Sequence, residues 1–242
     1  MSTEAGFLGK TVALARKDLR IEARARDTLP PMLAFVLAVT LLLAFTLPGG
    51  SDLAAPVDLP VGTASLADVL AGFMWITILF AGLIGFARTF EVERSEGALD
   101  ALLMAPVDRS GLFLSKAAAN LVSLAIVEVI LLPAFILFFD IELSGGWLAL
   151  IGVIVLADVG FVSVGTLFAA VAAQTRSREL VLPILALPTL VPVFIGATEL
   201  TSDLFAGGGP GEILEAGWFG VLAAFSLIFA ILGALGSDFV LD

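Results

Sequence analysis

The feature that most constrains this chain is a series of six long apolar runs, separated by short polar stretches. Each run is close to the roughly 20 residues that a helix needs to cross the hydrocarbon core of a bilayer. The runs are too long and too uniformly apolar for the strands of a membrane barrel, which alternate in polarity. We therefore predict an all-α membrane protein in which residues 1–242 form a single transmembrane domain. The six predicted spans are 30–47, 66–86, 117–139, 147–172, 180–198 and 218–236.

Composition excludes several other classes of protein. Hydrophobic residues make up 60% of the chain and charged residues only 14%, whereas a soluble domain is roughly half apolar and about a quarter charged. The chain has no Cys and no His, which excludes disulfides, thiolate chemistry and imidazole ligands for zinc or haem. The net charge of −11 argues against a nucleic-acid partner, which needs a basic footprint. Adaptation to high salt is one hypothesis for this acidity, and loss of stability on removing salt would test it.

The basic residues show which loops face the cytoplasm. The alternate loops 48–65, 140–146 and 199–217 contain no Lys or Arg, and cytoplasmic loops carry the excess of positive charge. The pattern predicts a multi-pass protein of the plasma membrane with both termini in the cytoplasm. All twelve basic residues lie before the first predicted span or in the two other loops: Lys10, Arg16, Lys17, Arg20, Arg24, Arg26, Arg88, Arg94, Arg109, Lys116, Arg176 and Arg178.

The segment 1–29 is too long and too mixed in charge for a cleavable signal peptide. Its apolar residues recur at helical spacing among the basic ones, which predicts an amphipathic helix lying on the cytoplasmic face of the membrane. The alternative is a solvated basic arm. We expect Pro30 and Pro31 to end this helix and turn the chain into the first span. The apolar stripe consists of Leu8, Val12, Ala15 and Leu19.

Two carboxylates interrupt the apolar spans. Glu128 and Asp158 each lie eleven residues into a predicted span, about 16 Å deep at 1.5 Å per residue, which is near the bilayer midplane. An ionisable group at this depth is costly and is by default a functional hypothesis. They could be protonated, share a proton, or face a polar cavity with Asn120, Ser123 and Ser163. The alternative is a hydrogen bond between neighbouring helices that holds the bundle together.

The fifth predicted span contains three prolines, Pro183, Pro188 and Pro192. Each removes a backbone donor and favours a kink in the helix. The span could line a translocation path or act as a gating element. The alternative is a packed, irregular helix whose bends are tolerated by its neighbours.

The loop 87–116 places leucines at helical spacing among alternating charges, and Gly97 and Pro106 punctuate it. This pattern is typical of one or two short helices that dock on a soluble partner. The alternative is a solvated loop whose charges only set the topology, but such a loop has no need of Leu99, Leu102 and Leu103. Gly9, Lys10 and Thr11 resemble the end of a phosphate-binding loop, but the earlier glycine of that pattern is replaced by Glu4. We therefore expect no nucleotide site in this chain.

Residues 93–106 resemble the pattern E-x-x-x-G-[TSA]-L-[ED]-x-L-[LM]-x-x-P of the CcmB family. That family comprises the permease subunits of the haem-exporter type ABC transporters of cytochrome c maturation. The proline-rich fifth span and the amphipathic start are also similar to the family, so the resemblance covers nearly the whole chain. The residues that carry the loop motif are Glu93, Arg94, Glu96, Gly97, Leu99, Asp100, Leu102, Leu103 and Pro106.

The resemblance implies a six-helix ABC-2-type (type V exporter-like) permease. The loop after the second span would be the coupling element that seats on a CcmA-like ATPase, and Arg176 and Arg178 would form a second cytoplasmic contact. A CcmC-like membrane subunit would be a further partner. The chain itself would be no enzyme and bind no cofactor directly. ATP would act through the ATPase, whose motions would drive either haem export or the release of a haem-loaded intermediate.

Two other functions remain open at the level of sequence. A general ABC-2 permease for a drug, lipid or glycan would share the overall form of the coupling loop. A proton-coupled carrier would use Glu128 and Asp158, although the chain has no evident inverted repeat and no basic residue inside a predicted span.

Overall fold

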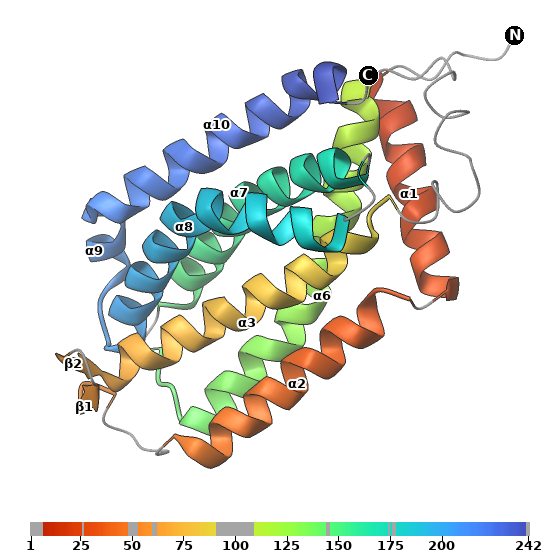
Figure 1. The fold of residues 1–242 in the computed structure, drawn as a ribbon. Helices are drawn as coiled ribbons and strands as arrows, with labels where there is room; N and C mark the ends of the chain where they lie inside the picture. The colour runs from red at the N-terminus through yellow and green to blue at the C-terminus, as the bar shows by residue number, and fades with distance from the viewer. Residues whose placement is uncertain are drawn as a thin grey trace, which may run out of the picture.

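The computed structural model describes residues 7–25, 27–47, 53–59, 62–90, 109–143, 146–173, 175 and 178–240. Six of its helices, α2, α3, α6, α7, α8 and α10, are long and apolar enough to cross a membrane, and they run together as one bundle (Figure 1). The prediction of an all-α protein with six membrane spans is therefore confirmed. The elements follow in the order α1 (Phe7–Ala25), α2 (Leu29–Thr46), β1 (Pro56–Leu59), β2 (Gly62–Ser65), α3 (Leu66–Arg88), α6 (Arg109–Phe139), α7 (Trp147–Ala173), α8 (Arg178–Phe205), α9 (Pro210–Glu215) and α10 (Gly217–Val240).

The centre of the bundle is formed by α3 and α7, the two spanning helices with the largest buried share. On one side α2 and α6 pack against α3, and on the other α8 and α10 pack against α7. The outer helices keep large apolar side chains such as Phe45, Leu137 and Leu235 exposed. Because lipid tails are as apolar as these side chains, this surface suits a bilayer as its solvent.

Two glycines let α3 and α7 approach closely. The ring of Phe161 lies where a Cβ at Gly82 would be, and the ring of Phe86 lies where a Cβ at Gly165 would be. The two rings meet edge to face, with centroids 4.9 Å apart. Small residues at helix contacts are a common means of tight packing in membranes, and here they leave room for an aromatic layer across the core.

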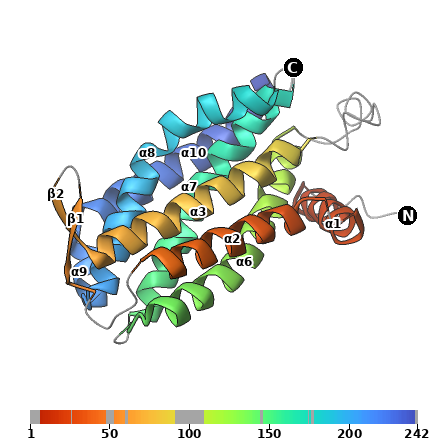
Figure 2. The same cartoon turned by 60° about the horizontal axis from the view of Figure 1, so that its bottom comes forward.

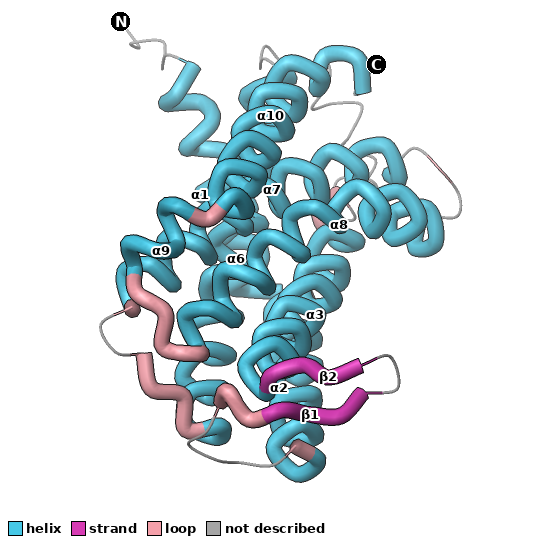
Figure 3. The backbone as a smooth tube through the Cα atoms, turned by 90° about the vertical axis from the view of Figure 1, so that its left-hand side faces the viewer, coloured by secondary structure: helices cyan, strands magenta, loops and turns pink. Residues whose placement is uncertain are grey.

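At one end of the bundle lie the β1–β2 hairpin and α9 (Figure 3). The strands pair antiparallel, with Pro56 opposite Ser65, and this hairpin within the loop 48–65 was not predicted. Ser65 then caps α3 reciprocally with Asp68: each side chain accepts a hydrogen bond from the other's backbone N–H, at 3.1 and 2.9 Å. Asp68 also accepts a hydrogen bond from Ser202 of α8, which ties the two helices together at this end.

The third and fifth predicted spans differ most from the helices that the structure contains. The third begins at Arg109 rather than at residue 117, because Leu112 and Phe113 continue the buried face of the helix. The fifth continues to Phe205 rather than ending at residue 198. From the sequence, the segment 199–217 was expected to be a loop between two spans. Instead, it continues α8 and then forms the short helix α9, which packs against α8 and α7.

The predicted amphipathic segment forms α1, which crosses the end of the bundle and is seen nearly end-on in Figure 2. It packs against α6, while Val12 of the predicted apolar stripe remains 64% exposed. The expectation that Pro30 and Pro31 end this helix is wrong, because α1 ends at Ala25 and both prolines lie in the first turn of α2. Proline is tolerated there because the first N–H groups of a helix have no partner within it.

Candidate functional site

The predicted docking loop 87–116 is described only at its two ends: residues 87–90, which complete α3 and follow it, and residues 109–116, which begin α6. In the loop between α7 and α8, Arg178 is the first residue of α8 and Arg176 lies outside the described residues. The site is therefore built from the contacts that hold the ends of the docking loop. The loop residues that fall outside the described part of the chain are Glu93, Arg94, Glu96, Gly97, Leu99, Asp100, Leu102, Leu103 and Pro106.

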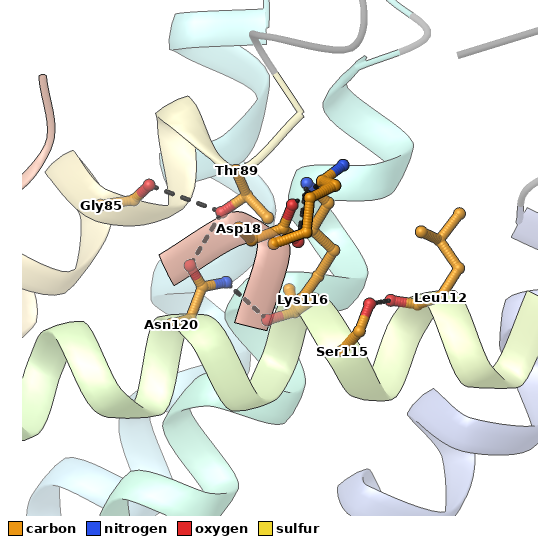
Figure 4. A network of polar contacts seen from close by, with 9 residues as sticks. Asp18, Gly85, Thr89, Leu112, Ser115, Lys116 and Asn120 are labelled. Atoms are coloured by element: carbon orange, nitrogen blue, oxygen red, sulfur yellow. Dashed lines mark hydrogen bonds and ion pairs between the residues drawn. The ribbon is translucent and has the colours of Figure 1, made fainter. Parts of the chain in front are cut away.

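A chain of side-chain hydrogen bonds joins three helices at the root of the loop (Figure 4). Thr89, which follows α3, donates from Oγ1 to Oδ1 of Asn120 on α6, at 3.2 Å. The Asn120 amide in turn donates to Oγ1 of Thr166 on α7, at 3.0 Å. Asn120 thus uses both ends of its amide, and a displacement of the loop root would be felt by α3, α6 and α7 together.

A buried ion pair attaches α1 to the same place. Lys116 of α6 lies 3.2 Å from Asp18 of α1, and their side chains are only 6% and 12% exposed. The Lys116 ammonium also lies 5.6 Å from the ring centroid of Phe90, within range of a cation–π interaction. We call Asp18, Phe90 and Lys116 the α1 anchor. Because Phe90 and Lys116 lie at the two described ends of the loop 87–116, the anchor holds these ends together.

The corner between α1 and α2 is fixed by Glu22. Its Oε1 accepts hydrogen bonds from the backbone N–H groups of Thr28 and Leu29, both at 2.9 Å. Partial burial alone would raise the pKa of Glu22, but these hydrogen bonds and the nearby Arg88 outweigh it, so the pKa is lowered. Glu22 therefore acts as an anionic N-terminal cap for α2, in the position where the helix dipole favours a negative charge.

The two intramembrane carboxylates come together between α6 and α7. Glu128 and Asp158 lie close enough to interact directly, and each is only 3% exposed. One oxygen of each, Glu128 Oε1 and Asp158 Oδ1, is buried without a hydrogen-bond partner among the described residues. We call these two residues the carboxyl pair.

The polar cavity that was expected to unite the carboxyl pair with Asn120 is replaced by separate contacts. Asn120 bonds to Thr89 and Thr166 at the loop root. Ser163, which was expected at the same cavity, donates to the carbonyl of Val159 in its own helix, at 2.6 Å. A serine or asparagine inside a span can satisfy itself locally in this way, which sequence spacing alone does not reveal.

All three prolines of the fifth span lie within the single helix α8. Pro188 is exposed, and Pro183 and Pro192 are half-buried, so none of them belongs to the fully buried core. The buried face of the helix, which includes Ala186 and Val193, packs against α7 and α3. The structure therefore places the prolines beside the packed seam and leaves their role in gating as a prediction.

Sequence reasoning missed the partners of the loop root. Asp18 and Glu22 are acidic residues within an amphipathic segment that is mostly basic. Their negative charge was the signal in the sequence that could have indicated an internal ion pair and a helix cap. Lys116 was read only as a charge that sets topology. Phe90 and Leu182 of α8 also line an apolar pocket at this end with three alanines of α7.

Comparison with known proteins follows this geometry. A family model described as "CcmB protein" matches residues 10–238. Heme exporter protein B of Rhodobacter capsulatus is 29% identical over 188 residues, which cover 78% of this chain and 80% of the relative. Heme exporter protein B of Haemophilus influenzae is 24% identical over 188 residues, covering 77% and 79% of the two chains.

Proposed function

The chain belongs to the CcmB family, and from this premise we propose that it is the permease subunit of an ABC transporter that exports haem for cytochrome c maturation. The observation that carries the proposal is the family match from residue 10 to 238, which contains all six spanning helices. The six-helix architecture supports an ABC-2-type permease.

The proposed driving force comes from a separate ATPase subunit that docks on the loop 87–116. The α1 anchor and Asn120 support this role, because they join both ends of the loop to α1, α3, α6 and α7. A pull on the loop would then move several helices as one body instead of bending one loop. The loop between α7 and α8, with Arg176 and Arg178, would give the second cytoplasmic contact.

In this proposal the chain transmits work and performs no chemistry of its own. ATP is bound and hydrolysed in the partner, and haem is a cargo, not a resident cofactor. A CcmC-like membrane subunit is the second proposed partner, since ligation of haem iron by imidazole or thiolate would have to come from another protein: this chain contains no His and no Cys.

The proposed location is the plasma membrane, with both termini and the docking loop in the cytoplasm. The distribution of Lys and Arg along the chain supports this orientation. The ends of α1 and α10 near the chain termini lie toward one end of the bundle, and the β1–β2 hairpin lies at the other (Figure 1). That arrangement fits an even number of spans.

Deleting the gene and staining membranes for covalently attached haem tests the function. We expect c-type cytochromes to lose their haem while b-type cytochromes, which hold haem without a covalent link, persist. Unchanged c-type cytochromes would overturn the haem-export proposal and favour a general permease for a drug, lipid or glycan.

The coupling role is tested by complementing that deletion with Leu99→Asp/Leu102→Asp. The two introduced carboxylates should disrupt the proposed apolar contact with the ATPase. Loss of a central interface contact reduces the binding free energy by about 2 kcal/mol or more. Recovery of the ATPase with the permease should fall at least about tenfold, and covalent haem should fall with it. Ser95→Asp adds a charge to the same loop outside the predicted contact set, so it should leave both readouts near the wild-type level. Normal ATPase recovery in the double variant would show that the loop is not the docking site.

A further inference from the structure

The carboxyl pair occupies matching positions on two antiparallel helices. Glu128 lies eleven residues before the end of α6 at Phe139, and Asp158 lies eleven residues after the start of α7 at Trp147. Residues equally far from the turn of a helical hairpin lie at the same level, here about 16 Å from the turn. The contact therefore follows from the hairpin itself as well as from the side chains.

Within the part of the chain that the structure describes, no basic residue lies at this level to neutralise the pair. The helices that pack against α6 or α7 are α1, α2, α3, α8, α9 and α10. Helix α2 has no ionisable residue, and α1 packs across the cytoplasmic end of α6, at the level of Lys116. In the remaining helices, and elsewhere in α6 and α7, the ionisable residues lie near the ends: Asp68, Arg88, Arg109, Lys116, Arg178, Glu179, Glu199, Asp203, Glu212, Glu215 and Asp238.

We infer that Glu128 and Asp158 together form a binding site for one proton, which is shared between their carboxyl groups and holds α6 against α7. Two carboxylates have only acceptor oxygens, so a hydrogen bond between them requires a proton on one of the two. Binding of one proton leaves an O–H on one residue, which donates to the carboxylate of the other. The pair then carries one negative charge, whereas a second charge this close in a buried site would be strongly repelled.

The unpartnered oxygens support a proton rather than a structural hydrogen-bond network. Glu128 Oε1 and Asp158 Oδ1 are buried without any protein donor among the described residues. A pair kept only for packing would be expected to satisfy these atoms, because an unsatisfied buried polar atom costs free energy. In this arrangement the shared proton itself joins α6 to α7. This inference does not depend on the cargo, so it can fail while the proposed function stands.

Infrared spectroscopy of the purified full-length protein in lipid nanodiscs tests the inference directly. At neutral pH the wild type should show a C=O stretching band of a protonated carboxylic acid, shifted to lower frequency in deuterated water. Glu128→Gln and Asp158→Asn should each abolish the band, because the remaining carboxylate then accepts from the new amide and needs no proton. Asp68→Asn is the matched control: the Asp68 carboxylate accepts from Ser65 and Ser202, so the band should remain.

Two results would overturn the inference. One is the absence of a carboxylic-acid band in the wild type, above all if adding sodium chloride perturbs the carboxylate bands, which would indicate a bound sodium ion instead. The other is a band that persists at its wild-type intensity in either amide variant. Either amide variant alone gives a decisive reading, so failure of one to purify as a folded protein leaves the test intact through the other.

Discussion

Two buried polar pairs hold α6, and they differ in how their charge is balanced. The pair near the start of α6 joins Lys116 to Asp18 of α1, and its opposite charges balance each other at 3.2 Å. The pair in the membrane interior joins Glu128 to Asp158 of α7, and both members are acidic. In the first pair the two side chains neutralise each other's charge. In the second pair the negative charge can be reduced only by a proton or cation from outside the chain.

This difference follows depth along the helix. Lys116 and Glu128 are twelve positions apart, about 18 Å along α6. Near the membrane surface a lysine can extend its ammonium toward the polar zone, so a full charge is tolerated there. Toward the midplane a charged group is far more costly. Helix α6 is thus held near its start by an ion pair and in its middle by two carboxyl groups. Binding of one proton removes one of the two negative charges of these carboxyl groups.

The largest effect should come from removing the cation of the α1 anchor. Lys116→Leu leaves Asp18 buried without its main partner, and breaking a buried pair in this way costs about 3 kcal/mol. Lys17 also lies 3.1 Å from Asp18, which favours the lower end of the range for such losses. Thermal unfolding of the purified protein in nanodiscs measures the effect, with Arg20→Ala, an exposed cation of α1, as the control that should change stability by less than about 0.5 kcal/mol.

A double variant separates the loss of the pair from the cost of a stranded charge. Asp18→Leu/Lys116→Leu removes both charges, and it should be more stable than Lys116→Leu alone. Equal stability of the single and double variants would show that the stranded carboxylate of Asp18 is not the cause, and the α1 anchor would then be a surface contact of little energetic weight.

The carboxyl pair should tolerate the loss of one member better. In Glu128→Leu, Asp158 can take up a proton and become a neutral acid with unsatisfied polar atoms, which costs about 1–3 kcal/mol. The same thermal unfolding, carried out beside Lys116→Leu, should give the smaller loss. Glu128→Leu/Asp158→Leu should recover much of it. A loss larger than that of Lys116→Leu would contradict the idea that a proton neutralises the interior pair.

The six-helix architecture could be predicted from the sequence because the length of an apolar run is a local property of the chain. Six runs near 20 residues can only be spanning helices, and the same reasoning placed Glu128 and Asp158 deep in two of them. Their pairing was also within reach, since both are equally far from the connection at 140–146. A proton shared between the two was one of the alternatives that the sequence left open, and the antiparallel hairpin of α6 and α7 favours it by placing both residues at one level.

The contacts at the root of the loop 87–116 depend on tertiary structure, so no local pattern in the sequence predicted them. Asp18 and Lys116 are 98 positions apart, and only the crossing of α1 over α6 brings them together. The capping role of Glu22 likewise depends on the turn that carries Thr28 and Leu29 back toward α1. The β1–β2 hairpin is four residues per strand, which is too short for an alternating pattern to be distinguished from a loop.

The smallest effect should come from Glu22, the cap that water can reach. Glu22→Gln keeps an acceptor for the N–H groups of Thr28 and Leu29 but removes the charge, and the loss of such a cap interaction is about 0.5–1 kcal/mol. Because the pKa of Glu22 is lowered from 4.5 in the folded protein, its charge stabilises the fold fully above pH 4.5. That contribution disappears as the pH falls through the lowered pKa. Melting temperatures of wild type and variant should therefore differ at pH 7 and converge in acid, while Glu142→Gln, an exposed glutamate at the opposite end, should match the wild type throughout. A difference that stays constant with pH would show that the shape of the glutamate, and not its charge, holds the corner between α1 and α2.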